Sequence, residues 1–133
     1  MMTGVEVGRA TRDEQEVRSL IASWEQAIRA GDLDGVVARH ADDVVMFDVA
    51  PPLHRSGLAD CRAAWEPFVH GGPHAHFELG ELALHVGADV AFAHALLRLT
   101  PKAPYEVRIT LGFEKRGERW TFVHEHHSAP SNS

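Results

Sequence analysis

The segment AGDLDGVVARHADDVVMFD, residues 30 to 48, contains the end of one helix, a second short helix and an apolar strand. Gly31 ends the helical pattern before it, and Asp32 is a suitable N-cap for the short helix. The apolar side of that helix consists of Leu33, Val36 and Val37. Val44 to Phe47 then predict an apolar strand that ends on the carboxylate of Asp48.

Asp48 is the first candidate for a functional residue. Its sequence neighbours are mostly apolar, both before it and after it. Loss of hydration in apolar surroundings raises the pKa of a carboxyl group, which lets it act as a general base near neutral pH. The alternative is an Asp at a strand end that only caps a turn, and without further information the residues favour this alternative.

The composition is that of one globular domain. The chain has 133 residues, of which 44% are hydrophobic and 24% charged, enough for one hydrophobic core. Thirteen scattered basic residues and nineteen acidic ones give a net charge of -6, so nucleic acid and acidic membranes are not expected as partners. The single cysteine, Cys61, excludes an internal disulfide and fits a reducing compartment. With no signal peptide or membrane-length apolar segment, we expect a cytoplasmic protein.

Three helices are predicted in the first half of the chain. A capping box of Thr11 and Glu14 begins the first, whose apolar positions are Val17, Leu20, Ile21, Trp24, Ala27 and Ile28. The short helix after Asp32 is the second and ends in the stretch 41 to 43. The third has one apolar side, made of Leu58, Cys61, Trp65 and Phe68, with Pro67 in its last turn. Residues 49 to 57 contain two prolines and are predicted to be a loop.

After residue 73 the pattern changes from helical to alternating, which indicates strands. They are predicted near residues 74 to 80, 82 to 87, 90 to 100, 105 to 116 and 119 to 127, with turns at 87 to 89 and 116 to 118. Helices followed by antiparallel strands indicate an α+β domain of about six strands, with the helices on one face of the sheet. The domain is expected to span residues 11 to 128, between flexible segments at 1 to 10 and 129 to 133.

The last hairpin allows a register prediction. With Gly117 and Glu118 in the turn, the pairs Phe113 with Phe122, Leu111 with His124, and Ile109 with His126 share one face of the sheet. Because that face is mostly apolar, the register puts both histidines on the helix-covered side. The reverse face then holds Arg108 opposite His127 and Thr110 opposite Glu125, an arrangement suited to solvent or to a subunit contact.

These features together resemble a known superfamily. The order of three helices and a curved sheet resembles the nuclear transport factor 2-like superfamily. Residues 30 to 48, followed by Arg55, Ser56 and Gly57, are most similar to bacterial ketosteroid isomerase, and the closing WTFVHEHHSAP is similar to SnoaL-like and kinase-association domains. The resemblance implies a cone-shaped, strongly curved, mixed and mainly antiparallel sheet, enclosing a pocket with three N-terminal helices. It also implies a homodimer formed through the sheet.

The resemblance to ketosteroid isomerase places the general base of that family on Asp48. In the isomerase, a tyrosine and a protonated aspartic acid form an oxyanion hole for the enolate. The tyrosine position holds Trp24 in this chain, and the position of the second acid holds Leu111. The indole of Trp24 can donate one hydrogen bond, and Leu111 can donate none. Steroid isomerisation itself is therefore not expected.

The predicted site combines Asp48 with other donors. His126 and His124 are the catalytic candidates beside it, because an imidazole can stabilise an oxyanion, and loss of one such donor costs about 3 kcal/mol. The residues expected to line the pocket are Trp24, Leu111, Phe113, Phe122, Trp65 and His94. For each histidine the alternative is a structural residue that bonds only to backbone or to another side chain.

No cofactor or metal is predicted. No Gly-rich phosphate turn follows a strand, so a nucleotide, flavin or nicotinamide site is not indicated. His124 and His126 are spaced so that both imidazoles can reach one ion, and Asp48, His54 or His94 are conceivable third ligands. Because neither a cysteine cluster nor an HExxH motif accompanies them, we do not predict a metal site.

Two hypotheses about function follow. The first is a cofactor-free enzyme that isomerises, cyclises or dehydrates a small apolar carbonyl compound by acid-base chemistry, with Asp48 as the base. The second is a module of the same fold that only binds a small ligand or builds an assembly. The position and local setting of Asp48 slightly favour the enzyme, although a fold by itself does not define a function.

Overall fold

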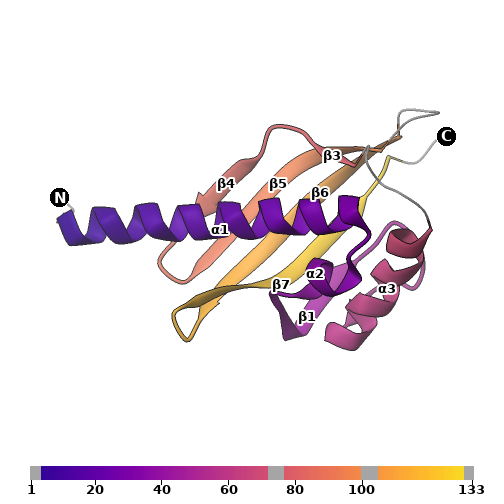
Figure 1. Cartoon of the computed structure of the whole chain (residues 1–133), viewed down its shortest axis with the longest axis horizontal. Coiled ribbons are helices and arrows are strands. Elements are labelled where there is room, and N and C mark those ends of the chain that lie inside the picture. Colours follow the sequence, from indigo (N-terminus) through magenta and orange to yellow (C-terminus); the bar gives the residue numbers. More distant parts are fainter. Residues whose placement is uncertain (1–3, 72–76, 100–104, 131–133) are drawn as a thin grey trace.

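The computed structural model describes residues 4–71, 77–99 and 105–130 and shows an α+β fold with helices packed on one face of a sheet (Figure 1). Its helices are α1 (Gly4–Ala30), α2 (Leu33–Val37) and α3 (Leu58–His70). Its strands are β1 (His40–Phe47), β2 (Arg55–Ser56), β3 (Glu78–Leu79), β4 (Ala83–Val86), β5 (Val90–Leu99), β6 (Tyr105–Arg116) and β7 (Arg119–Ser128). No helix of the described segments is long and apolar enough to cross a membrane.

The sheet is mixed and mainly antiparallel, as predicted. Its strand order is β2-β1-β7-β6-β5-β3, and β4 pairs with β5. Only β1 and β7 run parallel among these pairs, and their contact brings the end of β1 beside the second half of β7. Figure 1 shows α1 lying across the strands and α3 close to β1. Residues from the first strand and the last strand can therefore share one site under α3.

Regular alternation separates the two faces of β5. Its inward side chains are buried and mostly small, whereas its outward ones are exposed. The inward residues are Ala91, Ala93, Ala95 and Leu97. Above this face, the ring of Trp24 packs edge-on against Trp65 at 5.8 Å and Phe77 at 5.9 Å between ring centroids. The ring of Trp24 also lies 6.2 Å from that of Phe122 on β7, again between centroids. Full burial of a large apolar side chain contributes about 1.5–3 kcal/mol, so Trp24 anchors α1 to both α3 and the sheet.

The first two helices differ in how well their starts were predicted. Asp32 is the N-cap of α2, as predicted, because its carboxylate accepts a hydrogen bond from the Gly35 amide at 3.0 Å. The capping box at Thr11 is wrong, since α1 begins at Gly4 and Thr11 lies inside it. No proline interrupts residues 4 to 10, and an established helix extends at little cost because each added residue gains a hydrogen bond.

Two further boundaries correct the predictions. Residues 41 to 43 belong to β1 and do not end a helix, because β1 already pairs with β7 at His40 opposite Phe122. The predicted loop between β1 and α3 contains β2, whose residues pair with Val45 and Met46. The predicted strand near 74 to 80 is described only from residue 77, and β3 covers Glu78–Leu79 of it. Its first part lies outside the described residues.

The register of the last hairpin changes at a β-bulge. Phe113 faces Phe122 as predicted, but the next pair is Gly112 with His124, so Val123 is an extra residue in β7. A bulge shifts the register by one residue and so exchanges the two faces of the strand beyond it. A side chain at Gly112 would place its Cβ 3.2 Å from the Cβ of His124. Glycine therefore permits the close approach of the strands at this point.

The bulge reverses the faces predicted for the end of β7. Glu125 and His127 are buried on the helix-covered side, opposite Leu111 and Ile109. His124 and His126 lie on the other face, so the prediction that they face the helices is wrong. The predicted polar pairs of the reverse face, which contained Glu125 and His127, are wrong for the same reason.

Candidate active site

A cavity of about 590 Å³ lies between α3 and the sheet, a size typical of sites for small molecules. Most of its lining is apolar and comes from β1, α3, β5 and β6. These apolar residues are Met46, Val49, Ala50, Ala63, Ala64, Trp65, Pro67, Phe68, Phe77, Leu97, Leu99, Val107 and Ile109. The polar residues of the lining are Asp48, Arg55 and His127. The cavity thus suits a mostly apolar molecule that carries a polar group.

Asp48 and His127 lie next to each other in this lining. Asp48 directly follows β1, and its Oδ1 accepts a hydrogen bond from the Val49 amide at 2.7 Å. The Nδ1 atom of His127 is 3.4 Å from the same Oδ1 atom. This distance is longer than an ordinary N–H···O hydrogen bond, so a polar atom of a bound molecule can compete for Nδ1. The parallel contact of β1 with β7 brings the two residues together.

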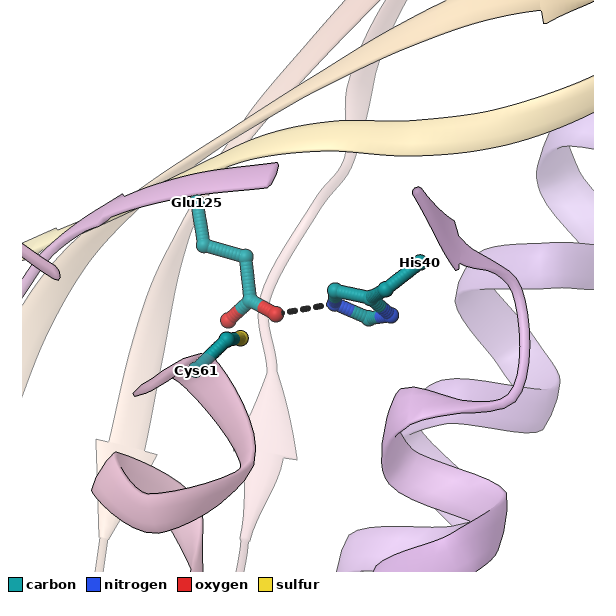
Figure 2. Close-up of side chains that lie close together, drawn as sticks. All are labelled: His40, Cys61 and Glu125. Carbon is teal, nitrogen blue, oxygen red and sulfur yellow. Dashed lines mark hydrogen bonds and ion pairs between the residues drawn. The ribbon is translucent and has the colours of Figure 1, made fainter. Parts of the chain in front are cut away.

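Behind His127, the carboxylate of Glu125 is completely buried and accepts three hydrogen bonds. Its Oε1 atom accepts from His127 Nε2 at 2.9 Å and from Trp65 Nε1 at 3.1 Å. Its Oε2 atom accepts from His40 Nε2 (Figure 2). The residues Asp48, His127, Glu125 and His40 thus form a chain of contacts that runs from the cavity into the core, and we call it the buried relay.

The charges in the buried relay stabilise one another. Burial by itself would raise the pKa of Glu125, but the charge of His40 and the hydrogen bonds of His127 and His40 outweigh burial and lower this pKa. Burial would likewise lower the pKa of His127, yet its close contact with Asp48, its hydrogen bond to Glu125 and the negative charge of both carboxylates raise this pKa to about 9. His127 is therefore an imidazolium at neutral pH, held between two carboxylates.

Asp48 was expected to have a raised pKa, and the structure contradicts this. Burial does favour its neutral form, but the close contact with His127, the positive charge of that ring and the amide of Val49 lower the pKa below its ordinary value. The apolar neighbours along the chain do not control the surroundings of the carboxylate. Its environment is set by β7, whose bulge brings His127 to the same side.

Arg55 is the third polar residue of the cavity lining. It lies on β2, and its Nη1 atom donates a hydrogen bond to Asp60 Oδ1 at 3.0 Å. Asp60 Oδ2 also accepts a hydrogen bond from the Ser56 amide at 3.1 Å. Because Asp60 lies in the first turn of α3, this turn holds the guanidinium of Arg55 in place. Arg55 thus adds a second cationic side chain, in addition to that of His127, to the lining of the cavity.

The structure places the other predicted site residues in three environments. Trp65 lines the cavity, whereas the remaining aromatic and aliphatic candidates are buried in the core and are not part of this lining: Trp24, Leu111, Phe113 and Phe122. His94 is exposed on the opposite face of the sheet, in a depression of about 480 Å³ formed with residues of β4 and β6. The four core residues pack among other apolar side chains, and their surfaces are therefore not available to the cavity.

His124 and His126, the predicted partners of Asp48, also lie away from the cavity. His124 Nδ1 is 2.8 Å from the carbonyl oxygen of Val45, and both imidazoles contact the ring of Phe47 on the outer face. Sequence reasoning missed His127 and Glu125 because a single extra residue exchanges the faces. The one available signal was Gly112 in a strand interior, a residue that often marks a bulge.

A cluster of possible metal ligands lies at the buried end of the relay. Ligand atoms of His40, Cys61 and Glu125 come within 4.8 Å of one another (Figure 2), and these are residue types that bind zinc. However, His40 donates directly to Glu125, and the Cys61 thiol lies 3.9 Å from the Met46 sulfur. Burial and the charge of Glu125 raise the pKa of this thiol. The hydrogen bond of His40 to Glu125 and the contact of Cys61 with Met46 thus account for the arrangement of these three side chains.

Solved structures of the nuclear transport factor 2-like fold are similar to this chain. A protein of unknown function with this fold from Pseudomonas putida is 37% identical, with a TM-score of 0.85 over 92% of this chain and 89% of that one. A candidate ketosteroid isomerase from Parabacteroides distasonis is 19% identical, with a TM-score of 0.72 over 86% of each chain. A candidate dehydratase from Streptomyces avermitilis is 16% identical, with a TM-score of 0.75 over 92% of this chain and 99% of that one.

The family follows from a second comparison. The model of the SnoaL-like domain matches residues 17–132, which is most of the chain. The chain therefore belongs to the SnoaL-like domain family, within the nuclear transport factor 2-like fold. No curated protein matches it.

Proposed function

We propose that this protein is a cofactor-independent enzyme that transfers protons on a small, mostly apolar carbonyl compound. Isomerisation, cyclisation and dehydration are the reactions that fit this proposal. The observation that supports it is the pair of Asp48 and His127, which are in contact in the lining of a mostly apolar cavity. An ionised carboxylate beside an imidazolium supplies a base and an acid in one place.

Asp48 acts as the base in this proposal, and His127 acts as the acid. Within the described residues, the contacts of the Asp48 carboxylate fall on Oδ1, so Oδ2 is available to accept a proton from the carbon beside a carbonyl group. The Nδ1–H group of His127 donates to the carbonyl oxygen or to a leaving hydroxyl. Environments that shift two pKa values in opposite directions assign the base and the acid in this way.

The lowered pKa of Asp48 makes it a weak base, so the enolate requires strong stabilisation. The imidazolium of His127 provides a positive charge and a proton donor at the required position. Loss of one such donor costs about 3 kcal/mol of barrier in enzymes that stabilise an oxyanion. His127 thereby takes the part that the tyrosine and the second acid have in ketosteroid isomerase, whose positions Trp24 and Leu111 hold here.

The candidate isomerase and the candidate dehydratase among the solved structures are consistent with this class of reaction. Both reactions remove a proton from carbon and return a proton to another atom. At identities of 19% and 16% these proteins support the shared fold, and the proposed chemistry depends on the residues of this chain.

The alternative is a binding module that holds an apolar ligand without changing it. The predominantly apolar lining of the cavity favours this alternative. The two functions differ in one observable, because only the enzyme exchanges protons between carbon and solvent. A binding module would instead protect the ligand from exchange.

The test is proton exchange on 2-tetralone, an enolisable apolar ketone, followed by NMR in deuterated buffer. We expect the wild-type protein to accelerate the exchange and Asp48→Asn to lower the rate by about 10²–10⁴-fold, the usual contribution of a general base. Asp42→Asn is the matched control, because Asp42 is an exposed carboxylate on β1, the strand that Asp48 follows. An unchanged rate in a folded Asp48→Asn protein would contradict the proposal.

A further inference from the structure

We propose that Glu125 and His40 are positioning residues that hold His127 in its charged form and direct its Nδ1–H group toward the cavity. This role rests on the function proposed above, because it assigns a task to residues that lie behind the acid. Neither Glu125 nor His40 is part of the cavity lining. Both can therefore act on a bound molecule only through His127.

The hydrogen bonds of His127 determine which nitrogen faces the cavity. Its Nε2 atom donates to Glu125 at 2.9 Å, which leaves Nδ1 on the side of Asp48. An ionised carboxylate accepts hydrogen bonds and donates none. Because both ring nitrogens face a carboxylate, both carry hydrogen, and the ring has no lone pair with which to act as a base. The geometry therefore restricts His127 to the role of proton donor.

Glu125 is itself fixed from three sides. The Trp65 indole of α3 donates to Oε1 at 3.1 Å, alongside His127 of β7. His40 of β1 donates to Oε2, and its ring stacks on Phe122 with 4.4 Å between centroids and an interplanar angle of 8°. These contacts prevent rotation of the carboxylate. His127 is thus positioned by an anchor that connects three elements of the fold.

A purely structural role explains this arrangement poorly. The side chains of His40 and Glu125 are both 0% exposed, and a carboxylate buried this deeply costs free energy that apolar residues of the same volume would not. His40 Nδ1 has no hydrogen-bond partner among the described residues, although it is buried. The His40 ring thus satisfies Glu125 while one of its own polar atoms stays unpaired.

The charged groups around His127 come from several elements. Asp48, which follows β1, and Glu125, on the same strand as His127, contact its two ring nitrogens. Arg55 of β2 lines the same cavity, but Asp60 partly neutralises it. Among the described residues, the charged groups in direct contact with the ring are therefore both acidic, and Glu125 is the fully buried one.

The experiment is an NMR titration of the ring nitrogens of His127 in the complete, substrate-free protein. In the wild type we expect both nitrogens to carry hydrogen at pH 7, with a midpoint near pH 9. In Glu125→Gln, which keeps the shape and removes the charge, we expect proton affinity to fall at least about tenfold, a midpoint shift of about one pH unit. A wild-type midpoint near pH 6.5 would overturn the proposal, as would an unchanged midpoint in folded Glu125→Gln.

A second variant keeps the test valid if Glu125→Gln does not fold. Glu125→Asp retains the charge but withdraws the carboxylate by one methylene, so the His127 midpoint should again decrease. An unchanged midpoint there would equally overturn the proposal. The matched control is Glu114→Gln on β6, which pairs with Arg116 away from the cavity and should leave the titration unaltered. Since the titration uses no substrate, its result is independent of the exchange test with Asp48→Asn.

Discussion

Asp48 and His127 each depend on the other for their charge. The imidazolium lowers the pKa of the carboxyl group, and the carboxylates on both sides of the ring raise the pKa of His127 to about 9. The pair therefore stays ionised across the neutral range. A base and an acid in their active forms at the same pH are the condition that general acid-base catalysis requires.

This mutual stabilisation predicts the pH dependence of proton exchange. The rate should be constant across neutral pH, because Asp48 is charged above a pKa lowered from 3.8 and His127 is charged below about 9. It should decrease in acid as Asp48 is protonated, and near pH 9 as His127 loses its proton. The measurement is the exchange rate of 2-tetralone between pH 3 and 10, corrected for the buffer. A fall in activity near pH 6.5 would contradict the assignment of His127 as the acid.

At the residue scale, the sequence identified one half of the candidate site. Asp48 was found because it ends an apolar strand in a segment similar to ketosteroid isomerase. His127 was not found, because the β-bulge determines which residue of β6 lies opposite it and which face of the sheet it occupies. Alternation in the sequence does not reveal this bulge. The sign of the pKa shift of Asp48 was missed for the same reason, since it depends on the histidine across the strand contact.

At the scale of elements, the periodicity of the sequence was sufficient for most helices and strands. The predicted strand at 105 to 116 agrees with β6, and the strand at 119 to 127 lies within β7. The boundaries of these two strands follow from local sequence, namely from the alternation of apolar and polar residues and from the turn at Gly117. The register beyond Val123 is not local, because it depends on packing of β7 between β6 and β1. Regular alternation therefore predicts where the elements lie but not which face a bulged strand presents.

Because the strands approach closely at the bulge, we expect any side chain at position 112 to lower the stability of the fold. Gly112→Val should lower the free energy of unfolding by about 1–3 kcal/mol, because its Cβ would lie 3.2 Å from the Cβ of His124. Urea denaturation measures this change. Gly117→Asn is the control, since position 117 has a positive φ that Asn tolerates and no atom within 4 Å of a new Cβ. Equal stability of Gly112→Val and the wild type would show that the strands do not require glycine there.

At the scale of the whole molecule, the helices of the described residues all pack on one face of the sheet and leave its outer face uncovered (Figure 1). β5 exposes large apolar side chains on this face, namely Val90, Phe92 and Leu96. Phe47 of β1 is also exposed there, beside His124 and His126. An exposed apolar sheet face of this kind often marks an interaction surface. We propose that two copies of the chain associate through it.

The proposed homodimer can be tested by one substitution on β5. Phe92→Asp should yield a monomer in light scattering, because a charge would be buried at the contact between the two sheets. The monomeric Phe92→Asp variant should still be folded, with a thermal stability close to that of a single wild-type domain, since Phe92 is outside the core. Leu53→Asp is the control, because Leu53 is exposed in a loop and should not alter the mass. A monomeric wild type at micromolar concentration would refute the proposal.

We propose that Asp48 and His127 act as one unit, and a double-mutant comparison of proton exchange distinguishes this from two independent roles. Asp48→Asn and His127→Gln should each reduce the exchange rate of 2-tetralone by about 10²-fold or more. Because residues that act together are not additive, the double variant should be about as slow as the slower single variant. A double variant whose loss equals the product of the two single losses would contradict the claim, as would a folded single variant with wild-type activity.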